Sequence, residues 1–213
     1  MSEFMRLKKI KGAEEYVNKS SYTIQDYEKY YKNFKNYFQN SNPIHLEICT
    51  GKGDFLIGMA KNFPQINFIG IEKYPSVLMK ALQKVEKENL KNIAFICMDA
   101  STIDKVFEKE IETIYLNFSD PWPKTKHHKR RLTSPIFLQK YEHLFSNNKK
   151  IIMKKDNQDL FEYSLITTTN HGYKIEDISF DLHHTNRFNM KTEYEERWSK
   201  KGYPIYYVLL TKE

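Results

Sequence analysis

Short apolar runs alternate with amphipathic segments along most of the chain. Runs of this length predict buried strands, and the apolar positions between them follow the spacing of one helix face. The predicted strands are Ile44–Cys49, Phe68–Glu72, Ile93–Met98, Ile114–Phe118, Lys150–Met153, Lys174–Leu182 and Ile205–Leu210. The predicted helices are Phe55–Asn62, Pro75–Glu88, Pro135–Phe145 and Asp156–Asn170, with a turn near Ser101–Phe107. This alternation predicts an α/β fold with an open, mostly parallel sheet.

The N-terminal part of the chain follows a different pattern. Residues 23–39 are rich in aromatic and charged residues and predict one amphipathic helix, which the run Asn40–Pro43 ends. The length of 213 residues suffices for one α/β domain and a short extension, so we expect an extension over residues 1–42 and a domain over 43–213. Two origins of Met1–Phe4 are open: a native start, or an added leader ahead of Met5.

Composition and charge narrow the class of protein. Hydrophobic residues make up 40% of the chain and the net charge is +7. The charge fits either a lysine-biased genome or a nucleic-acid partner. Because no run approaches the ~18 apolar residues of a membrane helix, and the start has no apolar signal region, we expect a cytoplasmic protein.

The two cysteines, Cys49 and Cys97, end predicted strands that have a third strand between them. Two strand spacings correspond to roughly 9–10 Å, and a disulfide requires Cα atoms within about 7 Å. We therefore predict free thiols, as expected in a cytosolic protein. The His and Cys residues lack zinc-site spacing, so no metal is expected.

In an open α/β sheet, ligands bind beyond the carboxyl ends of the strands. The first predicted strand runs into Glu47-Ile48-Cys49-Thr50-Gly51-Lys52-Gly53-Asp54, where Gly51 and Gly53 let the backbone approach a ligand closely. A dinucleotide fingerprint needs a third glycine where Leu56 stands, which disfavours NAD. A P-loop needs Ser or Thr after the lysine, where Gly53 follows Lys52, so ATP is excluded at this loop.

Carboxylates follow three neighbouring predicted strands. Glu47 would repel a pyrophosphate but suits a cationic ligand such as S-adenosylmethionine, which carries a sulfonium and an ammonium group. Glu72 ends the second strand, where a carboxylate accepts both ribose hydroxyls. Asp99 and Ala100 follow the third strand, where they can hold the adenine amino group.

This constellation resembles the class I S-adenosylmethionine methyltransferases. The resemblance implies a Rossmann-like fold with a mostly parallel, seven-stranded sheet flanked by helices, and makes residues 43–213 the methyltransferase domain. The first motif of those enzymes has a glycine where this chain has Cys49, which alters the turn.

The fourth predicted strand runs into Asn117-Phe118-Ser119-Asp120-Pro121-Trp122-Pro123-Lys124. Two prolines fix φ and stiffen this loop, so Asp120 lies in a rigid mouth beside the cofactor site. The alternative is a simple turn with an Asp cap. The loop is a variant of the Asn/Asp-Pro-Pro-aromatic motif of amino methyltransferases.

A cationic run follows at once: Lys124-Thr125-Lys126-His127-His128-Lys129-Arg130-Arg131. Five of these eight residues carry permanent positive charges and two more are histidines. Such a run is often only a solvated face, but its place beside the predicted active site favours binding to nucleic-acid phosphates.

The loop and the cationic run together resemble the signature of bacterial tRNA (guanine-N7)-methyltransferases, as do Thr192-Glu193-Tyr194-Glu195 and Gly202–Tyr206. The resemblance extends from Met5 to the end of the chain. It implies transfer of a methyl group from S-adenosylmethionine to N7 of guanine 46 in the tRNA variable loop. The implied cofactor residues are Glu47, Gly51, Gly53, Glu72, Asp99, Ala100, Asn117 and Asp120. Asp120 would also be the catalytic residue. The implied substrate contacts are Lys124, Asp156, Thr192, Glu193, Tyr194 and Glu195, and the implied RNA contacts are Lys126, His127, His128, Lys129, Arg130 and Arg131.

Guanine N7 is a lone-pair acceptor without a proton, so its methylation needs no general base. We therefore expect Asp120 or Glu195 to accept the N1–H and N2–H₂ groups of the guanine and to orient N7 towards the methyl group. Trp122, Tyr194 or Phe188 could stack on the base.

Several alternatives stay open. Asp156 could simply cap the helix that it begins, and Thr192-x-x-Glu195 also fits a capping box. The chain could methylate another RNA position, or bind RNA without catalysis on a decayed methyltransferase fold, which Cys49 favours. A nicotinamide enzyme is a more distant possibility. The oligomeric state, monomer or homodimer, is open.

Overall fold

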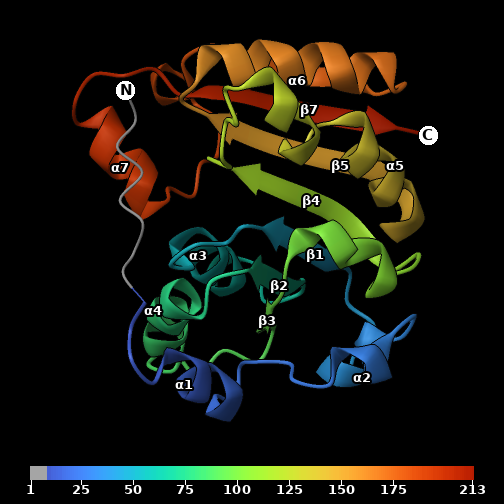
Figure 1. The fold of residues 1–213 in the computed structure, drawn as a ribbon, viewed down its shortest axis with the longest axis vertical. Helices are drawn as coiled ribbons and strands as arrows, with labels where there is room; N and C mark the ends of the chain where they lie inside the picture. The colour runs from blue at the N-terminus through green and yellow to red at the C-terminus, as the bar shows by residue number, and fades with distance from the viewer. Residues whose placement is uncertain (1–8) are drawn as a thin grey trace.

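The computed structural model describes residues 9–213. Met1–Phe4, for which the sequence leaves two origins open, lie outside the described residues. One seven-stranded sheet forms the centre of the fold, in the order β3-β2-β1-β4-β5-β7-β6 (Figure 1). The strands are β1 (Ile44–Ile48), β2 (Asn67–Glu72), β3 (Ile93–Cys97), β4 (Ile111–Asn117), β5 (Phe145–Lys155), β6 (Lys174–Ser179) and β7 (Tyr206–Lys212). β7 runs antiparallel to both of its neighbours, and the other pairings are parallel. The predicted seven-stranded, mostly parallel sheet is confirmed.

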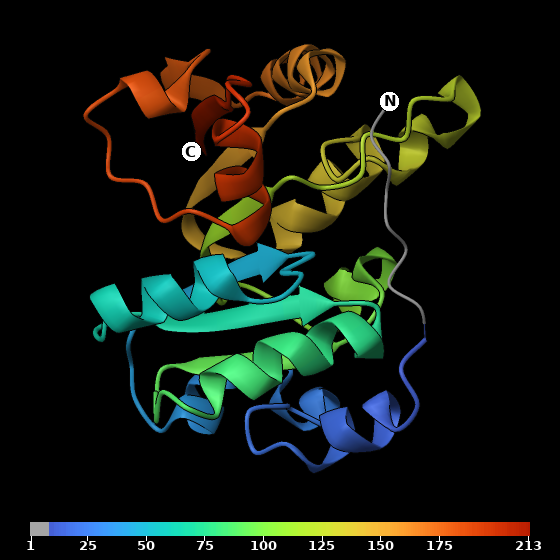
Figure 2. The same ribbon diagram turned by 90° about the vertical axis from the view of Figure 1, so that its left-hand side faces the viewer.

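Helices cover both faces of the sheet (Figures 1 and 2). One face carries α1 (Ala13–Lys19), α3 (Asp54–Asn62) and α4 (Pro75–Val85), and their apolar residues form one buried cluster. The other face carries α2 (Phe34–Phe38), η2 (Ala100–Lys105), α5 (Pro135–Leu144) and α6 (Gln158–Asn170), which enclose a second cluster. Because both faces are covered, every residue of the central strands β1 and β2 is buried, with no alternation between buried and exposed positions.

The prediction of one helix over residues 23–39 is wrong. The segment forms a short 3-10 helix, η1 (Tyr27–Tyr30), and α2, separated by Lys32 with a left-handed φ of 64°. Phe34 explains the break, because its fully buried ring lies 4.7 Å from that of Phe107 and its N–H donates to Glu110 Oε1 at 2.6 Å. The sequence interpretation also missed α1, which has only seven residues and two buried side chains.

The other boundaries lie within three residues of the predicted ones, except at the start of β5. β5 begins at Phe145 rather than Lys150. The N-cap of α6 is Asn157, whose side chain accepts the Leu160 N–H at 2.8 Å, so Asp156 as the cap is wrong by one residue. In the described part of the chain both cysteines are free, as predicted, and no helix is long and apolar enough to cross a membrane.

Candidate active site

The loop after β1 contains three left-handed residues in alternation: Cys49 (φ 64°), Gly51 (φ 60°) and Gly53 (φ 78°). Gly53 is required by packing, because a Cβ there would lie 2.8 Å from the Cβ of Ala81 on α4. A Cβ on Gly51, in contrast, would meet no atom within 4 Å. The loop therefore presents bare backbone to open space, as a ligand-binding turn does. Cys49 adopts this conformation at a cost of about 1–2 kcal/mol, because it carries a side chain.

Glu47 is a buried carboxylate at the end of β1. Its oxygens accept hydrogen bonds from Thr50 Oγ1 at 2.5 Å and from Asn117 Nδ2 at 2.8 Å. Burial raises the pKa of Glu47 to about 7. The amide oxygen of Asn117 is also buried and lacks a hydrogen-bond partner within residues 9–213. A cationic ligand beside Glu47 would stabilise its ionised form, and a donor could satisfy Asn117.

Glu72 and Asp99 end the next two strands. The buried Glu72 accepts the N–H of Gly51 at 3.2 Å and that of Tyr74 at 3.0 Å, which ties β2 to the glycine turn. Burial raises the pKa of Glu72. Asp99 is half-exposed and accepts the Ser101 N–H at 2.8 Å as the N-cap of η2, which begins at Ala100. An ion pair with Lys73 at 2.7 Å lowers the pKa of Asp99 to about 2.

The loop after β4 holds Asp120 at the surface on a strained backbone. Phe118 (φ 49°) and Trp122 (φ 42°) on either side are both left-handed, a conformation that costs energy and is typical of functional loops. Desolvation raises the pKa of Asp120, and the charge of Lys155 opposes this shift.

Lys155 is a site residue that the sequence interpretation missed. Its side chain is buried at the end of β5, and its Nζ donates to Ser119 Oγ in the Asp120 loop. Burial lowers the pKa of Lys155 to about 7, and the charges of Asp156 and Asp120 partly oppose this. The sequence signal that could have identified Lys155 was its position just beyond the carboxyl end of the predicted strand Lys150–Met153.

Most of the cationic run lies on the surface, on the short helix η3 (Thr125–Arg130). Lys124, Lys126, Lys129 and Arg130 are exposed, and His127 and His128 are half-buried. The His127 ring lies 5.7 Å from that of Trp122, and the Arg130 guanidinium lies 4.9 Å from the same ring. The run is therefore attached to the Asp120 loop through Trp122.

Arg131 differs from its neighbours, because only 5% of it is exposed. Its Nε donates to the Pro121 carbonyl at 2.9 Å and its Nη2 to that of Trp122 at 3.4 Å, while the guanidinium lies 4.3 Å from the centre of the Tyr163 ring. The structure thus gives Arg131 the geometry of a loop anchor rather than of a phosphate contact.

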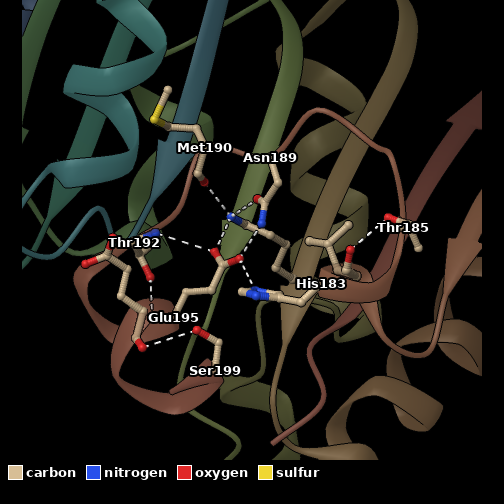
Figure 3. A network of polar contacts seen from close by, with 10 residues as sticks. His183, Thr185, Asn189, Met190, Thr192, Glu195 and Ser199 are labelled. Carbon is tan, nitrogen blue, oxygen red and sulfur yellow. Dashed lines mark hydrogen bonds and ion pairs between the residues drawn. The ribbon is translucent and has the colours of Figure 1, made fainter. Parts of the chain in front are cut away.

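A segment between β6 and β7 carries α7 (Glu193–Ser199), and in Figure 1 the arrow of β4 points towards the edge at which α7 lies. Figure 3 shows the polar network beneath it. Glu195 is fully buried, and its Oε1 accepts from His183 Nε2 at 2.8 Å and from Asn189 Nδ2 at 2.5 Å. Its Oε2 accepts from the buried Lys154 at 2.6 Å. Both oxygens of Glu195 are therefore used within the protein.

The other residues of the predicted Thr192–Glu195 motif join α7 to the site. Thr192 and Glu195 form a capping box, as the spacing predicted. Glu193 forms an ion pair with Lys52 of the glycine turn at 2.8 Å. The hydroxyl of Tyr194 donates to Asp156 at 2.7 Å, and its ring lies 5.2 Å from that of Phe118. The motif is thus brought to both ligand-facing loops.

Asn117 also borders a cavity of about 360 Å³ on the α3 face of the sheet, beneath the segment that precedes α7. Phe55, Tyr115 and Met190 line it, and Phe188 lies at its rim with 62% of its surface exposed. Within residues 9–213, no group of three or more His, Cys, Asp or Glu side chains is placed to hold a metal ion.

Residues 41–208 match the family described as "Putative methyltransferase". A Lachnoclostridium phytofermentans protein named tRNA (guanine-N(7)-)-methyltransferase is 44% identical over 98% of this chain and 99% of its own length. A protein of the same name from Oceanobacillus iheyensis is 45% identical over 95% of this chain and 96% of its own length. Two solved structures share the Rossmann-like fold. An antibiotic-related methyltransferase is 17% identical, with a TM-score of 0.66 over 84% of this chain and 92% of its own. The 16S rRNA methyltransferase KamB is 13% identical, with a TM-score of 0.64 over 84% of this chain and 92% of its own. The chain belongs to the tRNA (guanine-N(7)-)-methyltransferase family.

Proposed function

We propose that the protein transfers a methyl group from S-adenosylmethionine to N7 of guanine 46 in the variable loop of tRNA. The observation that carries this proposal is the meeting of three strand-end carboxylates, around a bare glycine turn, with the loop of Asp120 at one edge of the sheet. The names of the relatives support the choice of tRNA guanine as substrate.

The residues around the glycine turn fit S-adenosylmethionine. Glu47 accepts two hydrogen bonds, and its raised pKa is that of a buried carboxylate in need of positive charge. Glu72 would accept the ribose hydroxyls, and Asp99 with Ala100 would hold the adenine. Gly51 leaves the space that the ligand requires. The bound cofactor supplies an electrophilic methyl group.

Asp120 is the residue that we assign to the target guanine. Since both oxygens of Glu195 are bonded inside the protein, Asp120 is the carboxylate of the two with an exposed side chain. It would accept the N1–H and N2–H₂ groups and so hold N7 in line with the methyl group. Its negative charge also stabilises the cationic product. No proton leaves N7, so Asp120 positions and stabilises rather than acting as a base.

The exposed cations would hold the tRNA backbone. Lys124 and the run from Lys126 to Arg130 lie on the surface next to the Asp120 loop, where phosphates can approach them. Asp156 and Thr192–Tyr194 would contact the nucleotide, which is supported by the contacts of Tyr194 with Asp156 and with Phe118 of the Asp120 loop. The guanine must leave its stack to reach Asp120, as enzymes acting on bases generally require. A tRNA substrate would place the protein in the cytoplasm.

The test is transfer of labelled methyl groups to an unmodified tRNA transcript, followed by nucleoside analysis. We expect 7-methylguanosine, and none when position 46 is changed to adenine. Labelling that survives this change would indicate another RNA position. Calorimetry without detectable S-adenosylmethionine binding would instead support an RNA-binding protein without catalysis.

A further inference from the structure

A line of aromatic rings leads away from the Asp120 loop along α7. The ring of Phe118 lies 5.2 Å from Tyr194, Tyr194 lies 5.7 Å from Trp198, and Trp198 lies 5.0 Å from Tyr203. We call these four residues the aromatic strip. Its outer members, Trp198 and Tyr203, take no part in the site described above. Three ring-to-ring steps separate Tyr203 from Phe118 of the Asp120 loop, so Tyr203 lies beyond the place proposed for the methylated base.

The end of α7 fixes the outer half of the strip. Gly202 has a φ of 76° and its N–H donates to the Ser199 carbonyl at 2.9 Å, while the N–H of Tyr203 donates to that of Trp198 at 3.4 Å. This is a Schellman motif, which commonly brings the side chains at these two positions into contact. The motif explains why the two rings touch. It does not explain why 54% of Tyr203 is left in solvent.

Positive charge accompanies the strip. The ammonium group of Lys201 lies 4.7 Å from the centre of the Trp198 ring, and Arg197 and Lys200 are exposed at the end of the same helix. Aromatic rings interleaved with cations are the chemistry of single-stranded nucleic-acid binding, in which bases stack on the rings and phosphates meet the cations. A purely apolar protein partner would not require these charges.

We propose that Tyr203 is a stacking platform for an unpaired nucleobase of the tRNA beyond the methylated guanine. Trp198 holds the ring from behind, and Lys201 contacts the flanking phosphate. When one base is extruded from RNA, bases around it lose stacking partners, and an exposed aromatic ring can replace such a partner. This inference rests on the proposed function, because it takes the tRNA as the ligand, but it concerns a different surface from the cationic run.

The first test measures tRNA affinity and turnover for Tyr203→Ala, Tyr203→Phe and a matched control, Tyr31→Ala. Tyr31 is also an exposed aromatic residue (39%) but lies on the N-terminal segment, next to Glu108. Removing the stacking of one base weakens binding about 5- to 100-fold. We expect Tyr203→Ala to raise Kd and KM for tRNA by this factor, with the effect falling on KM rather than kcat. Tyr203→Phe keeps the ring and should bind within about twofold of wild type, as should Tyr31→Ala.

The second test uses the only two tryptophans of the chain, Trp122 and Trp198. In a Trp122→Phe background, Trp198 is the sole indole, and a short single-stranded RNA should quench it more strongly than a duplex of equal length. Lys201→Ala should flatten the salt dependence of single-strand binding by about 0.7, the slope of one phosphate interaction. If Tyr203→Ala lowers the melting temperature, Lys201→Ala tests the inference in its place.

Unchanged tRNA Kd and KM in Tyr203→Ala, with methylation retained, would overturn the inference and leave the proposed function standing. A wild-type protein that methylates no tRNA would overturn the proposed function instead. If Tyr203→Ala changes sedimentation but not tRNA affinity, the strip contacts a second copy of the chain, and the inference is also wrong.

Discussion

Lys155 is a buried cation that donates its hydrogen bond to the neutral hydroxyl of Ser119 rather than to a carboxylate. Burial lowers its pKa from 10.5 to about 7. Since one pKa unit corresponds to about 1.36 kcal/mol, burying the charged form opposes folding by up to about 5 kcal/mol. The substitution Lys155→Met keeps an unbranched side chain of similar length and removes the charge. We therefore expect the variant to be more stable than wild type at pH 6, by a few kcal/mol after loss of the Ser119 hydrogen bond.

The sign of the pH dependence makes this prediction specific. Because the folded pKa of Lys155 lies below the unfolded one, the unfolded chain binds more protons between about pH 7 and 10.5. Wild-type stability should rise with pH through this window and be lost as the pH falls towards 7, and Lys155→Met removes this slope. Urea unfolding at pH 6, 7.5 and 9 should show the advantage of the variant shrinking as the pH rises. An advantage that stays constant, or a variant less stable than wild type at pH 6, would refute the reasoning.

The same substitution should move the activity profile. The charge of Lys155 lowers the pKa of Asp120, against the upward shift from desolvation. Without Lys155, Asp120 takes up its proton at a higher pH, so the acidic limb of the rate profile should move to higher pH. A profile that coincides with that of wild type would show that the two groups do not interact.

Three further predictions concern the two loops. Cys49→Gly should raise the free energy of unfolding by about 1 kcal/mol, because glycine adopts the left-handed conformation without strain; a lower melting temperature would contradict this. Asp120→Asn should reduce turnover at least tenfold while tRNA affinity in gel-shift titrations changes little, and near-normal turnover would remove the assigned role. Replacing the exposed cations Lys126, Lys129 and Arg130 with Ala should flatten the salt dependence of tRNA binding by about 0.7–0.9 for each phosphate no longer neutralised. Arg131→Ala should instead mainly lower the melting temperature. Equal salt slopes for the two variants would contradict the distinction between the exposed cations and the buried Arg131.

The candidate active-site edge could be predicted from the sequence because ligands of such a sheet bind where parallel strands end. Glu47, Glu72 and Asp99 lie at or near the carboxyl ends of three strands, and the pairing of β1 with β2 and β2 with β3 brings those ends together. Strands β2 and β3 were predictable because buried parallel strands leave apolar runs, whereas β6 pairs antiparallel with β7 and most of its residues are exposed or half-buried.

The errors have a common physical origin. Whether a polar side chain turns inward depends on distant partners, which a local pattern does not contain. Lys155 was not singled out from the sequence, because lysines are rarely buried. Glu195 and Asp120 were left as alternatives for the guanine, because the local pattern does not show that Lys154, His183 and Asn189 surround Glu195. The helix expected over residues 23–39 failed because Phe34 is drawn into the core beside Phe107, a contact across the fold.

The hydrogen bonds of Arg131 bear on whether tRNA affinity and reaction rate can change independently. By sequence this residue belongs to the RNA-facing run, but its guanidinium is fastened to the carbonyls of Pro121 and Trp122, next to Asp120. Arg130 rests on the Trp122 ring from the same run. If the run binds tRNA and Asp120 orients the base, as proposed, these contacts link the two tasks. Substitutions in the run that change tRNA affinity would then also shift the Asp120 loop and the reaction rate.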